Sequence, residues 1–205
     1  LVSYVGKVNM DRNSPDYLRE QSAAASVAAT EEWICHTRDR FANTKPILTP
    51  RFIPSCSDEL LRGLRGLVEK YGLPVQSHLS ENFGEIAWVQ ELCPDSKFYG
   101  DAYDRYGLFG GDHKCIMAHC VHSDERELEL MKKNGVFVAH SPLSNANLAS
   151  GIAPVGRYLE RGLQVALASD VAGGETENLF AEMAAAIRVS KLRWRLTDQS
   201  VKPLS

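Results

Sequence analysis

The chain has 205 residues, enough for one domain with a substantial buried core. Its 23 basic and 26 acidic residues leave a net charge of −3, and no basic block is present to neutralise a nucleic-acid backbone. The apolar runs are short and interrupted by charges, which argues against a membrane-spanning helix.

Short apolar runs typical of buried parallel strands alternate with helical patterns along the chain. The expected strands are 4–8, 46–49, 74–77, 115–118, 135–139 and 163–168, and the expected helices are 14–43, 58–71, 81–93, 123–134, 154–161 and 175–195. Gly72, Gly135 and Gly162 stand where helix C-termini are expected. This alternation indicates an α/β fold with a parallel sheet, either doubly wound or closed into a barrel.

Polar or aromatic side chains follow most of the expected strands. In chain order these are Arg51, Phe52, His78, Glu81, His119, His140 and Asp170. The carboxyl ends of parallel strands open onto one face of a barrel, and ligands also bind beyond these ends in open sheets. A single histidine after a strand is more often structural, but ionisable residues at four successive strand ends favour a shared pocket.

The side chains at these strand ends suit a metal site. Two neutral imidazoles and a carboxylate are typical ligands of Zn²⁺, which keeps one position open for water in catalytic sites. Glu81 is then placed to move protons if it does not bind the metal itself.

Several segments resemble a known family. The segments SHLSE at 77–81, MAH at 117–119 and SDVAGG at 169–174 resemble the last three active-site segments of the metal-dependent aminohydrolases in the amidohydrolase superfamily. YVGKVNMD at 4–11, TPRF at 49–52 and HSPLSN at 140–145 narrow the resemblance to the guanine deaminase family. The similarity covers nearly the whole chain in the family's order and implies a TIM-type (β/α)8 barrel.

The resemblance implies chemical roles for the polar strand ends. His78 and Asp170 would be the Zn²⁺ ligands, and Asp170 would also accept a proton from the attacking water. Glu81 would carry a proton to the purine ring, and His119 would polarise or position the water. The implied reaction is hydrolytic deamination of guanine to xanthine and ammonia.

The resemblance also implies a binding site for the purine. Arg51 would hydrogen-bond to the carbonyl side of the base, and Phe52 would pack on its ring. Arginine suits this task because its planar, permanently charged fork recognises acceptor atoms directionally. His78, Glu81 and Asp170 would face the same substrate. The implied partners are a small-molecule purine and a second copy of the protein in a homodimer, with neither nucleic acid nor membrane.

The chain departs from the family pattern in one respect. The family has an HxH pair at the end of its first barrel strand, and no HxH occurs here. We therefore expect residues 1–205 to form a single partial barrel with strands three to eight, while the HxH strand and a C-terminal remainder lie outside it. Two ligands do not make a tight catalytic zinc site, so we expect the chain alone to be inactive.

Two other functions are compatible with these residues. The protein could be a related aminohydrolase that acts on cytosine, a triazine or an adenosine derivative, although Arg51 and Phe52 favour guanine. It could instead be a barrel fragment without catalysis, which the missing HxH pair would support. Five scattered cysteines without a CxxC pair favour neither disulfides nor a thiolate site, and they suggest a cytoplasmic setting.

Overall fold

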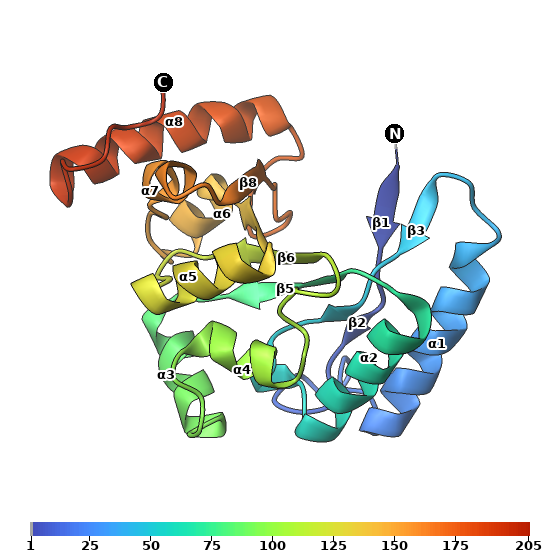
Figure 1. Cartoon of the computed structure of the whole chain (residues 1–205). Coiled ribbons are helices and arrows are strands. Elements are labelled where there is room, and N and C mark those ends of the chain that lie inside the picture. The colour runs from blue at the N-terminus through green and yellow to red at the C-terminus, as the bar shows by residue number, and fades with distance from the viewer. Residues whose placement is uncertain (1) are drawn as a thin grey trace.

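The computed structural model describes residues 2–205 and shows parallel strands with helices around them (Figure 1). β1 (Ser3–Val5) pairs with β3 (Thr44–Pro46), and β2 (Val8–Asn9) pairs with β4 (Thr49–Pro50). A four-stranded sheet follows in the order β5 (Val75–Leu79), β6 (Cys115–His119), β7 (Phe137–His140) and β8 (Gln164–Leu167). A parallel bridge between Leu48 and Val75 connects the first strands to this sheet.

The strand order decides between the two architectures that the sequence leaves open. Each strand of the four-stranded sheet pairs in parallel with its predecessor in the chain, and the order never reverses. A doubly wound sheet requires a point where the order reverses, whereas a barrel adds its strands one after another. The fold is therefore of the (β/α)8 barrel type, as predicted.

Helices connect the strands. They are α1 (Ala23–Arg38), α2 (Asp58–Tyr71), α3 (Phe83–Leu92), α4 (Tyr99–Arg105), α5 (Glu125–Asn134), α6 (Pro142–Asn147), α7 (Val155–Glu160) and α8 (Leu179–Leu196), with a short 3-10 turn η1 (Ile53–Ser55). The helix α2 has the predicted bounds. Its N-cap Ser57 accepts a hydrogen bond from the Leu60 amide, and Gly72 ends it with a left-handed φ of 65°.

The structure corrects the predicted start of two helices. The helix expected over 14–43 is shorter: α1 begins at Ala23, where the Ser22 side chain caps it, and ends at Arg38. Before it, the Glu20 amide donates to the Met10 carbonyl at 2.9 Å and the Glu20 carboxylate pairs with Lys7, so residues 14–22 are held as a loop beside the end of β2. α8 begins at Leu179 rather than at 175, because the Asn178 side chain accepts from the Phe180 amide.

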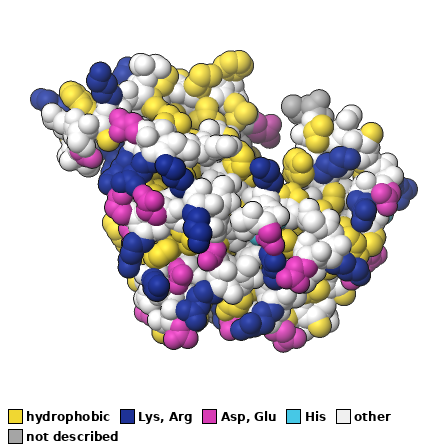
Figure 2. All heavy atoms as spheres, viewed as in Figure 1, with side chains coloured by type: hydrophobic (Ala, Val, Ile, Leu, Met, Phe, Trp, Pro, Cys, Tyr) yellow, Lys and Arg dark blue, Asp and Glu magenta, His cyan; other side chains and the backbone are white. Residues whose placement is uncertain are grey.

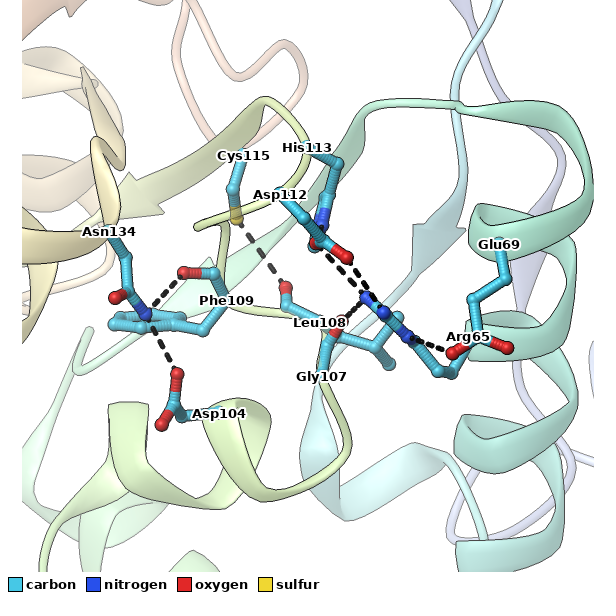
Figure 3. A network of polar contacts seen from close by, with 10 residues as sticks. All are labelled: Arg65, Glu69, Asp104, Gly107, Leu108, Phe109, Asp112, His113, Cys115 and Asn134. Atoms are coloured by element: carbon cyan, nitrogen blue, oxygen red, sulfur yellow. Dashed lines mark hydrogen bonds and ion pairs between the residues drawn. The ribbon is translucent and has the colours of Figure 1, made fainter.

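Two further helices, α4 and α6, were not expected from the sequence. A polar network beside α4 fixes the loop that leads into β6 (Figure 3). Arg65 of α2 donates to Asp112 at 2.8 Å and to the Gly107 carbonyl at 2.8 Å, and Asn134 of α5 donates to Asp104 at 2.7 Å. The Arg65 guanidinium holds the pKa of the Asp112 carboxyl below its usual range. The network therefore ties α2, α4 and α5 to one loop.

The distribution of charges on the surface agrees with the nearly equal numbers of acidic and basic residues in the chain. Acidic and basic side chains are interspersed on the face shown in Figure 2. In the part of the chain that the structure describes, no helix is both long and apolar enough to cross a bilayer. All five cysteines are free thiols, and three of them are buried: Cys56, Cys115 and Cys120.

Candidate active site

A cavity of about 220 Å³ brings together the residues that follow the parallel strands. Its lining residues are Arg51, Phe52, His78, Glu81, Glu85, His119, Leu148, Asp170 and Gly173. All six residues to which the sequence analysis gave a role are among them. The convergence follows from the fold, because the carboxyl ends of parallel strands lie at one end of the sheet.

His78 presents one ring nitrogen to the cavity in an unprotonated form. Its Nδ1 lies 2.6 Å from the Arg51 carbonyl oxygen, which can only accept a hydrogen bond, so Nδ1 carries the proton. Burial and the neighbouring His119 lower the pKa of His78, which favours the neutral ring. A neutral imidazole whose other nitrogen donates to a carbonyl is the form in which histidine binds metals.

His119 lies beside two carboxylates of the cavity, those of Glu81 and Asp170. Its ring is 1% exposed, and Nδ1 is 2.9 Å from Oδ1 of Asn145. That contact leaves Nε2 facing Oε2 of Glu81 at 3.8 Å and Oδ2 of Asp170 at 4.0 Å. The His78 ring stacks beside it, with 5.2 Å between ring centroids. Imidazole and carboxylate groups able to exchange protons are thus within a few ångströms of one another.

A short segment, residues 144–150, holds three of these groups in place. Asn145 contacts His119, the Ser144 hydroxyl donates to Asp170, and the Ser150 hydroxyl donates to Oε1 of Glu81 at 2.7 Å. No role was predicted for these three residues from the sequence. Ser144 and Asn145 lie in α6 and Ser150 follows it, and only their closeness in space identifies them as supports for the site.

Close backbone packing shapes the floor of the cavity. Ser80, His119 and Asp170 follow or end strands with φ values of 47°, 72° and 47°, a left-handed conformation that is uncommon for residues other than glycine. A Cβ atom on Gly173 would lie 2.7 Å from both the Asp170 carboxylate and the Ser144 hydroxyl. A side chain at position 173 would therefore push the Asp170 carboxylate or the Ser144 hydroxyl from its place.

Arg51 and Phe52 form one wall of the cavity. The Arg51 guanidinium lies over the Phe52 ring, with Cζ 4.7 Å from its centroid. The Phe52 ring also packs edge-to-face with the Trp88 ring of α3, with 6.1 Å between the ring centroids. Behind them, the Ser77 hydroxyl donates to the Pro50 carbonyl at 2.7 Å. These contacts hold the flat Phe52 ring and the Arg51 guanidinium together in the cavity lining.

The other histidines lie outside the cavity lining. His140 ends β7 but is 2% exposed, and burial lowers its pKa to about 4, so it is a neutral core residue near neutral pH. The ring of His122 contacts the Ser150 carbonyl at 2.7 Å. His113 pairs with Asp112 in the loop before β6, and His36 lies on the surface of α1. These positions agree with structural or surface roles for all four.

The donor atoms in the cavity fit a divalent metal in part. His78 offers a neutral nitrogen and Asp170 a carboxylate, the donor types that zinc accepts. Between residues 2 and 205, however, no group of three His, Cys, Asp or Glu side chains is placed to hold a metal by itself. Catalytic zinc sites use about three protein ligands. The described residues therefore supply a partial ligand set.

The fold and this site define a class: barrel proteins that carry histidine and carboxylate side chains at the carboxyl ends of their parallel strands. The chain belongs to the amidohydrolase family, whose model matches residues 2–204.

Among its relatives, a probable guanine deaminase from Schizosaccharomyces pombe is 40% identical over 203 residues, which cover 97% of this chain and 38% of that protein. The guanine deaminase of Dictyostelium discoideum is 37% identical over 193 residues, which cover 92% of this chain and 41% of the relative. A crystal structure of guanine deaminase from C. acetobutylicum with bound guanine is 50% identical, with a TM-score of 0.96, and the match covers this whole chain and 48% of that one. The chain thus spans less than half the length of each of these proteins.

Proposed function

We propose that this chain carries the substrate cavity of a guanine deaminase, which converts guanine and water to xanthine and ammonia. One observation supports this most directly. Nε2 of His119 faces the carboxylates of Glu81 and Asp170 in the cavity that Arg51 and Phe52 line. Acid–base groups thus stand beside a surface suited to a flat base with a carbonyl group. The guanine deaminases similar to this chain add independent support.

In this proposal, His78 and Asp170 would help to hold Zn²⁺. Both line the cavity, and the Nδ1 contact of His78 with the Arg51 carbonyl leaves its Nε2 available for a metal. A bound zinc ion supplies a water whose pKa is lowered to near neutrality. The remaining ligands would come from outside the described residues.

The carboxylates would share the movement of protons. Asp170 would accept a proton from the attacking water, while Glu81 would protonate a ring nitrogen and so make the amino-bearing carbon electrophilic. Ser150 holds Oε1 of Glu81, and Oε2 points toward His119. His119 would position the water between the two carboxylates. The water oxygen would bond to the amino-bearing carbon, and the proton held by Asp170 would pass to the amino group. The carbon–nitrogen bond would then break to release ammonia, the ring nitrogen would keep the proton from Glu81, and the new hydroxyl group would return a proton to Glu81 as the carbonyl forms.

Arg51 and Phe52 would orient the base. The guanidinium donates hydrogen bonds and cannot accept them, so it would select a carbonyl oxygen on the ring. Phe52 would pack on the ring face, and its contact with Trp88 limits its movement. The same wall would bind adenine poorly, because adenine offers an amino group where guanine has its carbonyl.

A substrate screen tests this function. The natural protein that contains this chain should release ammonia from guanine and form xanthine, with far lower activity on cytosine, triazines and adenosine derivatives. Xanthine formation can be followed by chromatography. Turnover of another amine without any turnover of guanine would contradict the proposal and favour a related aminohydrolase.

Zinc content is the second expected result. The 205-residue chain alone should retain clearly less than one tightly bound zinc ion after dialysis against a weak chelator, because His78 and Asp170 are only part of a catalytic ligand set. Elemental analysis measures this, with His78→Ala as the comparison variant that removes one proposed ligand. One equivalent of zinc surviving dialysis in the unmodified chain would show that the ligand set is complete without further residues.

A further inference from the structure

The chain that follows α6 holds the Ser150 hydroxyl against Glu81 in an unfavourable backbone conformation. Ser150 is 5% exposed and lies between Ala149, with a φ of 56°, and Gly151, with a φ of 124°. Left-handed backbone is uncommon for alanine, so contacts with the rest of the protein have to maintain it. The hydroxyl donates to Oε1 of Glu81 at 2.7 Å. The orientation of this hydroxyl therefore depends on whatever fixes the Ser150 backbone.

Two hydrogen bonds hold the Ser150 backbone, one on each side of its Cα atom. The Ser150 amide donates to the Asn145 carbonyl at 2.9 Å, a contact within the same segment. The Ser150 carbonyl oxygen lies 2.7 Å from Nε2 of His122. A carbonyl oxygen can only accept, so Nε2 carries the proton and donates it. His122 thus ties residues 144–150 to the loop that follows β6.

The His122 ring is itself held in place. Its backbone amide donates to the Ser80 carbonyl at 3.0 Å, and Ser80 is the residue before Glu81. The Phe83 ring lies against the His122 ring, with 4.0 Å between the ring centroids. A Cβ atom on Gly151 would lie 3.3 Å from Cε1 of the same ring. The ring is therefore packed between the start of α3 and the chain around Ser150.

We infer that His122 is a positioning residue for the proposed reaction, and that it holds the Ser150 carbonyl so that the Ser150 hydroxyl keeps Glu81 oriented for proton transfer. The contacts close a loop, because His122 bonds to the residue before Glu81 and, through Ser150, contacts the Glu81 carboxylate. His122 is outside the described residues that line the cavity, so it acts without touching the substrate. The inference rests on the proposed function, in which Glu81 protonates the ring.

Two substitutions of His122 test the hydrogen bond to Ser150. The amide nitrogen of glutamine occupies the position of Nε2 and can donate to the Ser150 carbonyl, whereas that of asparagine reaches only the position of Nδ1. In the natural protein, His122→Asn should lower kcat for guanine by roughly 2- to 10-fold, the range of one lost hydrogen bond. The KM should change by less than about twofold, because the groups proposed to bind the base keep their contacts. His122→Gln should recover most of the rate.

A double-mutant cycle tests whether His122 acts through Ser150. Ser150→Ala removes the hydroxyl that holds Glu81 and should itself lower kcat. In that background, His122→Asn should cost less than about twofold, because the group through which it acts is gone. His36→Asn, on the exposed surface of α1, is the matched control and should keep full activity. An equal loss in both backgrounds, or a loss in His122→Gln as large as that in His122→Asn, would overturn the inference.

A structural measurement distinguishes failure of this inference from failure of the proposed function. If the unmodified protein does not deaminate guanine, the proposed function fails. Crystal structures of the two His122 variants still test the positioning role through the distance between Oγ of Ser150 and Oε1 of Glu81. This distance should stay near 2.7 Å in His122→Gln. In His122→Asn it should exceed about 3.5 Å, beyond hydrogen-bond reach, and an unchanged distance there contradicts the inference.

Discussion

Glu81→Gln should abolish deamination while leaving the protein folded. The amide can still accept the hydrogen bond from Ser150, but it cannot transfer a proton to the ring. Loss of a general acid–base group typically lowers the rate by about 10²- to 10⁴-fold. The kcat for guanine measures the effect, and the thermal midpoint together with the zinc content of the natural protein should stay unchanged.

A matched variant controls for the loss of charge. Glu160 lies on the surface of α7, outside the cavity, so Glu160→Gln should retain full activity. If Glu81→Gln keeps turnover close to that of the unmodified protein, Glu81 has no place in the proton transfers. Another group of the cavity would then have to protonate the ring.

Leu64→Ala should cause a large loss of stability. Leu64 lies in the middle of α2 and is 0% exposed, packed in the core with Leu60, Leu61 and Leu67. Removing its side chain leaves a cavity and should lower the free energy of unfolding by about 2–5 kcal/mol. This is a large part of the roughly 5–15 kcal/mol that stabilises a typical domain.

Urea denaturation measures this loss through the transition midpoint. Leu196→Ala is the matched control, because Leu196 ends α8 and is 74% exposed. Its unfolding free energy should change by no more than about 0.5 kcal/mol. A cost below about 1 kcal/mol for Leu64→Ala would mean that the core around α2 collapses to fill the space.

The repeating elements of the fold could be predicted because their local signals agree with their tertiary setting. In α2, the serine N-cap, the apolar spacing and Gly72 all give the same bounds. β6 is a short and largely apolar run, and alternate residues of both β5 and β6 are buried. Where a run ends in His78 or His119, parallel topology alone is enough to bring the two residues together.

Other elements were missed because their signals depend on distant contacts. α4 is a seven-residue helix without a side-chain cap, and a seven-residue segment that contains a glycine carries little periodicity. Residues 14–22 contain helix-forming residues, but the Glu20 amide donates to the Met10 carbonyl at 2.9 Å and the Glu20 carboxylate pairs with Lys7, contacts that keep this segment irregular.

The segment 144–150 has a consequence for how this region of the protein can vary. Surface connections usually tolerate an inserted or deleted residue. Here the buried residues Ser144, Asn145 and Ser150 each hold a different group of the cavity, so a change of length would displace Asp170, His119 and Glu81 together. Substitutions at these anchors act on groups that lie beside one another, and their effects should not add independently. Residues 144–150 should therefore keep a fixed length in any working version of this site.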